Sequence, residues 1–252
     1  MTAPPVLIHY HIYKNAGTSM DAMLQASFGA GWGTIEAGPG STILTAEGLA
    51  AAIEAHPEWR AVSSHQARPP VPPRGLAVIF IRHPILRARS VFTYARRDST
   101  QPDHAVAMAG GFADYVHWAM TDGRAISPIL DYQTFHLSSA SLRWRQTGAI
   151  TSTPEDLAEA EALLRNIGVC GVVEEFEASC ARIEAAYRPH LPELSLPGAH
   201  ENRSDDGEAM PLAQRLARVA DELGPEMHAR LVAMNALDLR LYETARQVLH
   251  GR

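Results

Sequence analysis

The stretch VLIHYHIYKNAGTS, residues 6–19, decides the fold of this chain. Residues 6–12 are apolar or β-favouring, a pattern that predicts a buried strand. Met20, Met23 and Leu24 then follow at helical spacing, which predicts a helix over 18–28 whose start is capped by Thr18 or Ser19. The order is strand, tight loop, helix, which is the building unit of α/β proteins.

The same order recurs along the chain, which predicts one domain over residues 1–252. Strands alternating with helices indicate a three-layer α/β fold, with a mainly parallel sheet and helices on both faces. Ligands of such sheets bind beyond the carboxyl ends of the strands. The further strands are expected at 59–64, 76–81 and 169–173, and the further helices at 47–55, 84–97, 112–118, 154–167, 176–187, 212–223 and 225–249.

Composition narrows the class of protein. The chain has 252 residues, 46% of them hydrophobic, and a net charge of −6, so it is not built to coat nucleic acid. Cys170 and Cys180 are too few for a disulfide framework and are expected to be buried thiols in a reducing compartment. The sequence shows no signal-peptide pattern and no apolar run long enough to span a membrane. We therefore expect a cytoplasmic protein with no membrane span, of undetermined oligomeric state.

The loop over residues 11–19 has the features of an anion cradle. Backbone N–H groups at the start of a helix attract an anion, and Gly17 lets a ligand approach the backbone closely. Lys14 adds a mobile positive charge, and Thr18 and Ser19 add hydroxyl donors. The loop is not a Walker A motif, because Lys14 precedes the glycine by three residues instead of following it. The loop favours a phosphate or a close relative; the alternative is an ordinary turn with a solvated lysine.

A second strand-to-helix junction carries another set of anion-binding groups. Arg82 stands where the strand over 76–81 ends, and Ser90 lies about two turns into the next helix. An arginine fork and a hydroxyl together suit a second phosphate. Arg87 and Arg89 cannot both share a face with Ser90, so at least one is expected to be a solvated surface charge.

These two elements, HIYKNAGTS and RHPILRARS, resemble the motifs H-I-P-K-T-A-G-T-S and R-D-P-x-x-R-x-x-S. Those motifs belong to sulfotransferases that use 3′-phosphoadenosine 5′-phosphosulfate (PAPS), in the family of heparan sulfate 2-O-sulfotransferase and many bacterial carbohydrate sulfotransferases. Three later segments extend the resemblance over nearly the whole chain: DYQT at 131–134 is similar to N-Y-Q-T, GVVEEFE at 171–177 to G-x-x-E-x-F, and NALDLRLYE at 235–243 to N-x-x-D-x-x-L-Y-E.

The resemblance implies a P-loop-NTPase-like sulfotransferase fold and a transferase that moves a sulfuryl group from PAPS to a hydroxyl, with 3′-phosphoadenosine 5′-phosphate (PAP) as product and no metal. The resemblance points to carbohydrates as the acceptors. Arg82 and Ser90 would hold the 3′-phosphate, and the polar loop with Asn202, Arg203 and Ser204 could close over the nucleotide. The residues implied to hold the 5′-phosphosulfate are Lys14, Asn15, Ala16, Gly17, Thr18 and Ser19.

Sulfuryl transfer needs a positive charge near the leaving phosphate oxygen and a base near the acceptor hydroxyl. Lys14 is the natural stabiliser of the leaving phosphate oxygen. His65 follows a predicted strand, where the family places its histidine base, and an imidazole titrates near neutral pH. His83, which replaces the family's aspartate, is expected to support Arg82. Tyr13 replaces a proline, and Phe135-His136 stand where an arginine is usual, which leaves the acceptor open.

Other readings of the same residues remain. His9 and His11 share one face of a strand, but no third metal ligand accompanies them at a recognisable spacing, so no metal site is predicted. Arg68, Arg96 and Arg97 could meet an acceptor or be solvated charges. A small-molecule kinase would need a metal-binding carboxylate where Arg82 stands. A PAPS-binding module without catalysis would not need both Lys14 and His65.

Overall fold

A computed structural model describes residues 4–36, 43–123, 127–148, 150–197 and 210–251 of the chain. The chain divides into two compact units, each built from separate stretches of sequence. The first unit comprises Met1–Ile81, Glu159–Asn202 and Glu243–Arg252, and the second Arg82–Ala158 and Arg203–Tyr242. The prediction of a single domain stays a prediction, and each unit is described by itself.

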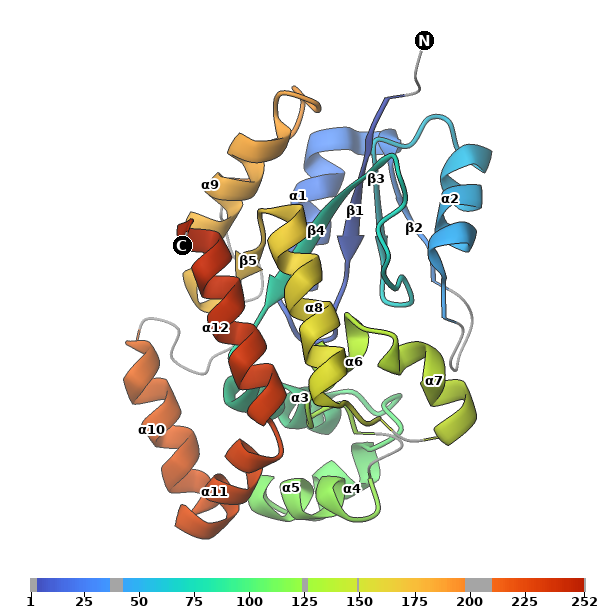
Figure 1. Cartoon of the computed structure of the whole chain (residues 1–252). Coiled ribbons are helices and arrows are strands. Elements are labelled where there is room, and N and C mark those ends of the chain that lie inside the picture. Colours follow the sequence, from blue (N-terminus) through green and yellow to red (C-terminus); the bar gives the residue numbers. More distant parts are fainter. Residues whose placement is uncertain (1–3, 37–42, 124–126, 149, 198–209, 252) are drawn as a thin grey trace. The chain divides into compact units, whose positions relative to one another are not determined.

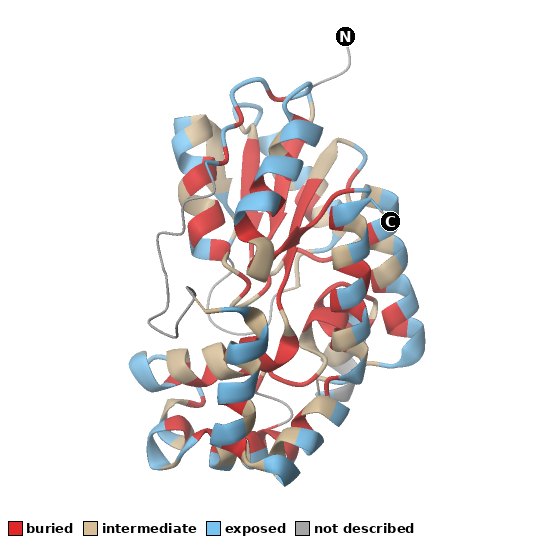
Figure 2. Ribbon diagram, turned by 90° about the vertical axis from the view of Figure 1, so that its left-hand side faces the viewer, coloured by how far each residue is buried: buried red, intermediate tan, exposed pale blue. Residues whose placement is uncertain are grey.

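The first unit is built on a five-stranded sheet in the order β2-β3-β1-β4-β5 (Figure 1). Every neighbouring pair is parallel, as the alternation of strands and helices predicts. β1 is central and buried along its whole length, so its residues do not alternate between polar and apolar (Figure 2). The strands are β1 (Val6–Tyr10), β2 (Trp32–Thr34), β3 (Ala61–Ser64), β4 (Gly75–Ile81) and β5 (Gly171–Val172).

Helices cover both faces of this sheet. α1 (Gly17–Phe28) and α9 (Phe176–Tyr187) pack on one face, where Met20 and Phe176 join the strand residues Leu7 and Phe80 in a common core. The part of α8 (Pro154–Ile167) that belongs to this unit lies over the opposite face (Figure 1). The predicted α/β class with helices on both faces of a parallel sheet is confirmed. The unit also holds α2 (Ala46–Ala55) and the end of α12 (Ala236–His250).

The second unit is helical and begins with α3 (Pro84–Arg97), whose proline stands in the first turn, where a missing N–H costs nothing. Phe92 of α3 packs against the rings of Phe112 and Tyr115, with ring centres 5.3 Å apart in both pairs. The other helices are α4 (His104–Ala109), α5 (Phe112–Met120), α6 (Tyr132–His136), α7 (Ala140–Thr147), α10 (Leu212–Leu223) and α11 (Pro225–Ala233).

Several boundaries differ from those predicted. The helix expected over 225–249 is two helices, and Asn235, which stands between them, accepts a side-chain hydrogen bond from the Asp131 N–H (3.1 Å). The capping prediction is wrong: α1 begins at Gly17, and the N-cap position is Ala16 in left-handed conformation. β2 and helices α4, α6 and α7 were not predicted, since short elements carry too little periodicity.

The prediction of buried thiols is confirmed. Cys170 and Cys180 are free and buried, and burial raises the pKa of both thiols to about 12. Among the residues that the structure describes, no helix combines the length and the apolar character needed to cross a membrane.

Candidate functional site

β1 and β3 bring the predicted loop and the predicted base to the same edge of the sheet. Tyr10, the last residue of β1, is paired with Ser64, the last residue of β3. The His11 N–H continues this pairing by donating to the Ser64 carbonyl (3.0 Å). The two parallel strands therefore deliver the loop from residue 11 and the side chain of His65 to neighbouring places.

The loop after β1 is a tight turn that is stabilised by hydrogen bonds of its own residue Asn15. Lys14 and Ala16 both have positive φ (65° and 61°), which few residues other than glycine adopt readily. Asn15 is buried, donates from its side-chain amide to the Phe80 carbonyl (2.7 Å) and from its backbone to Ile12 (3.1 Å). This gives Asn15 a structural part beside its predicted contact with a nucleotide. The loop then opens directly into the first N–H groups of α1, which have no partner inside the helix.

Gly17 is required because an imidazole occupies the place of its side chain. A Cβ at Gly17 would lie 1.7 Å from His11 Nε2, which is far inside contact distance. The His11 ring in turn stacks on the ring of His65, with centres 3.7 Å apart and planes 28° from parallel. The ring of His11 therefore lies between His65 and Gly17 of the loop after β1.

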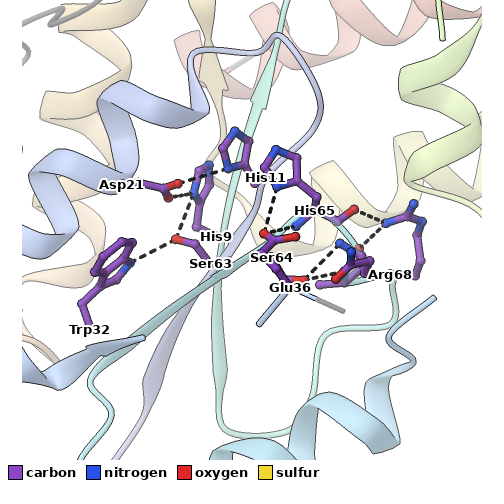
Figure 3. A network of polar contacts seen from close by, with 11 residues as sticks. His9, His11, Asp21, Trp32, Glu36, Ser63, Ser64, His65 and Arg68 are labelled. Atoms are coloured by element: carbon purple, nitrogen blue, oxygen red, sulfur yellow. Dashed lines mark hydrogen bonds and ion pairs between the residues drawn. The ribbon is translucent and has the colours of Figure 1, made fainter. Parts of the chain in front are cut away.

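His65 is held by a carboxylate that the sequence did not reveal (Figure 3). Glu36 Oε1 accepts from the His65 backbone N–H (3.2 Å) and lies 2.9 Å from His65 Nδ1. A hydrogen on Nδ1 completes this contact and leaves Nε2 as the basic nitrogen. Burial works to raise the pKa of Glu36, but the hydrogen bond from His65 outweighs it and lowers that pKa. Arg68 braces the same turn, because its guanidinium donates to the His65 carbonyl (2.8 Å).

A second carboxylate, Asp21 of α1, joins the two strand histidines. Its oxygens lie 2.8 Å from His9 Nδ1 and 3.2 Å from His11 Nδ1 (Figure 3). Burial works to raise the pKa of Asp21, but hydrogen bonds from His11 and His9 outweigh it and hold that pKa well below its usual range. Burial also lowers the pKa of His11 to about 4, so this ring is neutral at pH 7. Asp21 therefore stays ionised beside a neutral His11.

The side chains of His9, His11 and Asp21 could together hold a metal ion. Ligand atoms of His9, His11 and Asp21 all lie within 4.8 Å of one another. A third ligand therefore does accompany the two histidines in space, although it does not stand at a spacing that is recognisable in the sequence. Asp21 lies ten residues beyond His11, and only the packing of α1 against the sheet brings its carboxylate back to β1. Two histidines and one carboxylate form a ligand set suited to zinc or iron.

In the second unit, Arg82 is fixed through its backbone. The Gln133 side chain accepts from the Arg82 N–H (2.8 Å) and donates to the Arg82 carbonyl (2.9 Å). Gln133 is itself held by Asp238, which accepts from the backbone N–H groups of Gln133 (3.0 Å) and Thr134 (2.7 Å). The segments 131–134 and 235–243, noted as separate motifs, thus form one buried network behind Arg82.

The two arginines that follow Arg82 have distinct environments, and neither is simply a solvated charge as predicted for at least one of them. Arg87 is fully buried, donates to the Pro128 carbonyl and lies 5.0 Å from the centre of the Tyr132 ring. Arg89 forms an ion pair with Glu222 (2.7 Å). Ser90 lies half-buried on α3, one turn beyond Leu86 on the same stripe.

The remaining predicted residues fall in three places. Lys14, Thr18 and Ser19 belong to the first unit, whereas Arg82 is the first residue of the second, so their convergence on one nucleotide stays a prediction. Arg96 and Arg97 lie in the last turn of α3. The residues of the later polar loop lie outside the part of the chain that the structure describes: Asn202, Arg203 and Ser204.

The sequence argument missed Asp21 and Glu36. Asp21 could have been found, because it stands four residues after Gly17 and so faces the same side of the helix. Glu36 follows β2, a three-residue edge strand with too few residues to show a pattern. The position of Glu36 next to His65 depends on β2 pairing with β3.

Comparison with known proteins adds one relative and no family. No protein-family model matches the chain. An uncharacterized protein of Archaeoglobus fulgidus is 28% identical over 247 residues, which cover 94% of each chain. The likeness therefore extends over nearly the whole length of both proteins, and it assigns no activity.

Proposed function

We propose that this protein is a PAPS-dependent sulfotransferase that transfers a sulfuryl group to a hydroxyl, on a carbohydrate acceptor. One observation carries the proposal: the His65 ring, held by Glu36, stacks on His11, and His11 lies against Gly17 of the anion loop. In this proposal His65 is the base, and it lies beside the loop that we propose binds the phosphate-like group. The likeness of the loop and of RHPILRARS to sulfotransferase motifs supports PAPS as the donor.

The reaction assigned to this arrangement is an in-line displacement at sulfur. His65 Nε2 takes the proton of the acceptor hydroxyl as the acceptor oxygen forms its bond to sulfur. The bond between sulfur and the bridging phosphate oxygen breaks, and PAP leaves with the additional negative charge on that oxygen. Lys14 and the N–H groups at the start of α1 stabilise this charge where it develops.

The two carboxylates have separate roles in this scheme. Glu36 orients His65 and stabilises the imidazolium that forms during transfer. Asp21 keeps the hydrogen of His11 on Nδ1 and holds the ring in its stack. Because His11 is neutral at pH 7, it does not repel a proton arriving on His65.

The proposal also includes the type of fold, the cellular compartment and the absence of a metal requirement. The parallel sheet with an anion loop after its central strand is compatible with a P-loop-like sulfotransferase fold. The free, buried thiols suit the reducing cytoplasm. No metal is required, since Lys14 and the backbone amides carry the charge.

The test is transfer of labelled sulfate from PAPS to a panel of glycans, lipids and small alcohols. Lys14→Ala and His65→Ala are each expected to reduce turnover by about a hundredfold or more. His65→Ala should leave PAP affinity nearly unchanged, because His65 acts on the acceptor. If no acceptor is sulfated and PAP does not protect the protein against thermal unfolding, the proposal is wrong. Tighter binding of Mg²⁺-ATP than of PAP would favour a kinase instead.

A further inference from the structure

The second unit contains a cavity of about 140 Å³ between α3 and α10, and arginines dominate its wall. Four guanidinium groups face one carboxylate, so the lining carries a net charge of four minus one, or +3. Such a concentration of like charge is unfavourable unless an anion neutralises it. The lining residues are Arg82, Leu86, Arg89, Arg215, Arg218, Val219 and Glu222.

The one carboxylate that lines the cavity, Glu222, already forms an ion pair. Glu222 pairs with Arg89 Nε at 2.7 Å, which leaves the arginines of α10 without that counter-charge. Arg215 and Arg218 stand one turn apart on α10, a spacing at which like charges destabilise a helix. Arg215 Nε is buried and has no hydrogen-bond partner among the described residues. A bound oxyanion would supply both the missing acceptor and the missing negative charge.

The helix next to the cavity adds to its positive potential. Leu86, in the first turn of α3, lines the cavity, and the start of a helix carries a partial positive charge. His83 lies in this potential: burial first, and then the charges of Arg215 and His228, together lower its pKa to about 4. A neutral His83 adds no charge of its own near neutral pH.

We infer that this cavity is a binding site for a phosphate monoester and that Arg215 and Arg218 are two of its ligands. Guanidinium forks match the oxygens of a tetrahedral dianion, and more than one fork is needed to hold both charges. Arg82, whose backbone is held by Gln133, also lines the cavity and supplies a third fork. The phosphate chemistry rests on the cavity alone. Its identification as the 3′-phosphate of the sulfate donor rests on the proposed function.

Calorimetric titration of the full chain with three probes tests this site. PAP carries a 3′-phosphate, adenosine 5′-phosphosulfate lacks one, and inorganic phosphate carries no nucleoside. Arg215→Gln is expected to weaken PAP binding about tenfold or more, and Arg218→Gln severalfold, because charge-assisted hydrogen bonds are lost. Arg230→Gln, an exposed arginine on α11 of the same unit, is the matched control and should change nothing.

The probes separate the sources of the phosphate. Loss of PAP affinity with unchanged adenosine 5′-phosphosulfate affinity assigns the cavity to the donor's 3′-phosphate. If the wild-type protein binds inorganic phosphate but not PAP, and the arginine variants lose phosphate binding, the cavity is still a phosphate site but the proposed sulfotransferase function is wrong. If Arg215→Gln and Arg218→Gln, both with wild-type thermal unfolding, bind PAP and phosphate as the control does, the inference is overturned.

Discussion

The side-chain amide of Gln133 makes two hydrogen bonds to the backbone of Arg82, one as acceptor at 2.8 Å and one as donor at 2.9 Å. This pairing copies the way in which a neighbouring strand would bind the peptide, at the point where β4 has ended. Gln133 is fully buried and is itself anchored on Asp238. The orientation of Arg82 therefore depends on a residue 51 positions away in the sequence.

Gln133→Ala should be strongly destabilising. It removes the partner of the Arg82 N–H and the partner of the Arg82 carbonyl in a buried place, where each unsatisfied group costs about 1–3 kcal/mol. We expect a loss of about 2–4 kcal/mol in the free energy of unfolding, measured by urea denaturation. Gln214→Ala, at an exposed position of α10, is the control. A difference between the two variants below about 0.5 kcal/mol would show that the Gln133 bonds add little.

Gly17→Ala should disturb the stacked histidines. The new methyl group would meet the His11 ring at 1.7 Å, so the ring or the loop must move, and His65 loses its stacking partner. We expect turnover to fall about a hundredfold or more and thermal stability to fall as well. Gly111→Ala, where the nearest atom is 3.7 Å away, should be tolerated. Wild-type turnover in Gly17→Ala would contradict the stacked arrangement.

Replacing Glu36 should change the tautomer of His65. With Glu36 present, the hydrogen lies on Nδ1; in Glu36→Ala we expect a larger share on Nε2, read from the imidazole ¹⁵N shifts. Turnover should fall about tenfold, and Glu36→Gln should be milder because its amide oxygen still accepts from Nδ1. Glu58→Ala is the matched control, since Glu58 pairs with His56 at 3.0 Å on the surface. Unchanged ¹⁵N shifts of His65 in Glu36→Ala would exclude this positioning role, whatever the turnover.

Acid should destabilise the protein partly through His83. Its pKa is about 4 in the folded chain against 6.5 for the unperturbed group, so the unfolded chain binds the proton first as the pH falls. Stability from this group is complete above pH 6.5 and is lost as the pH falls toward 4. In His83→Gln the loss over this window should be smaller by about 2–3 kcal/mol. Urea unfolding at several pH values, with the exposed His117→Gln as control, measures it; parallel pH profiles of wild type and His83→Gln would refute it.

Metal removal should leave the transfer reaction unchanged. The proposed chemistry places the developing charge on Lys14 and backbone amides, so prolonged treatment with EDTA is expected to preserve turnover. Elemental analysis should find no stoichiometric zinc or iron. A loss of turnover on chelation that zinc restores, together with loss of the metal in Asp21→Asn, would instead assign a metal to His9, His11 and Asp21.

Much of the fold could be predicted from the sequence because its signals are local. The strands and several helices follow from apolar periodicity, and α3, α8, α9 and α10 begin and end where predicted. The proposal that the loop after β1 is an anion cradle also came from local signals, namely its glycine, lysine and hydroxyls. Short elements such as β2 and α6 were missed because pairing and packing, and not periodicity, hold them in place.

The sequence by itself determined the α/β class, and it singled out the loop over residues 11–19 and the side chains of Lys14, His65 and Arg82 as candidates for the site. Tertiary structure alone decided their surroundings: Glu36 beside His65, Asp21 between His9 and His11, and Gln133 behind Arg82. The composition and spacing of residues predict only local structure, which is set by contacts within one strand or one helix. Hydrogen bonds between residues tens of positions apart depend on which strands pair and which helices pack, and only the folded chain fixes those.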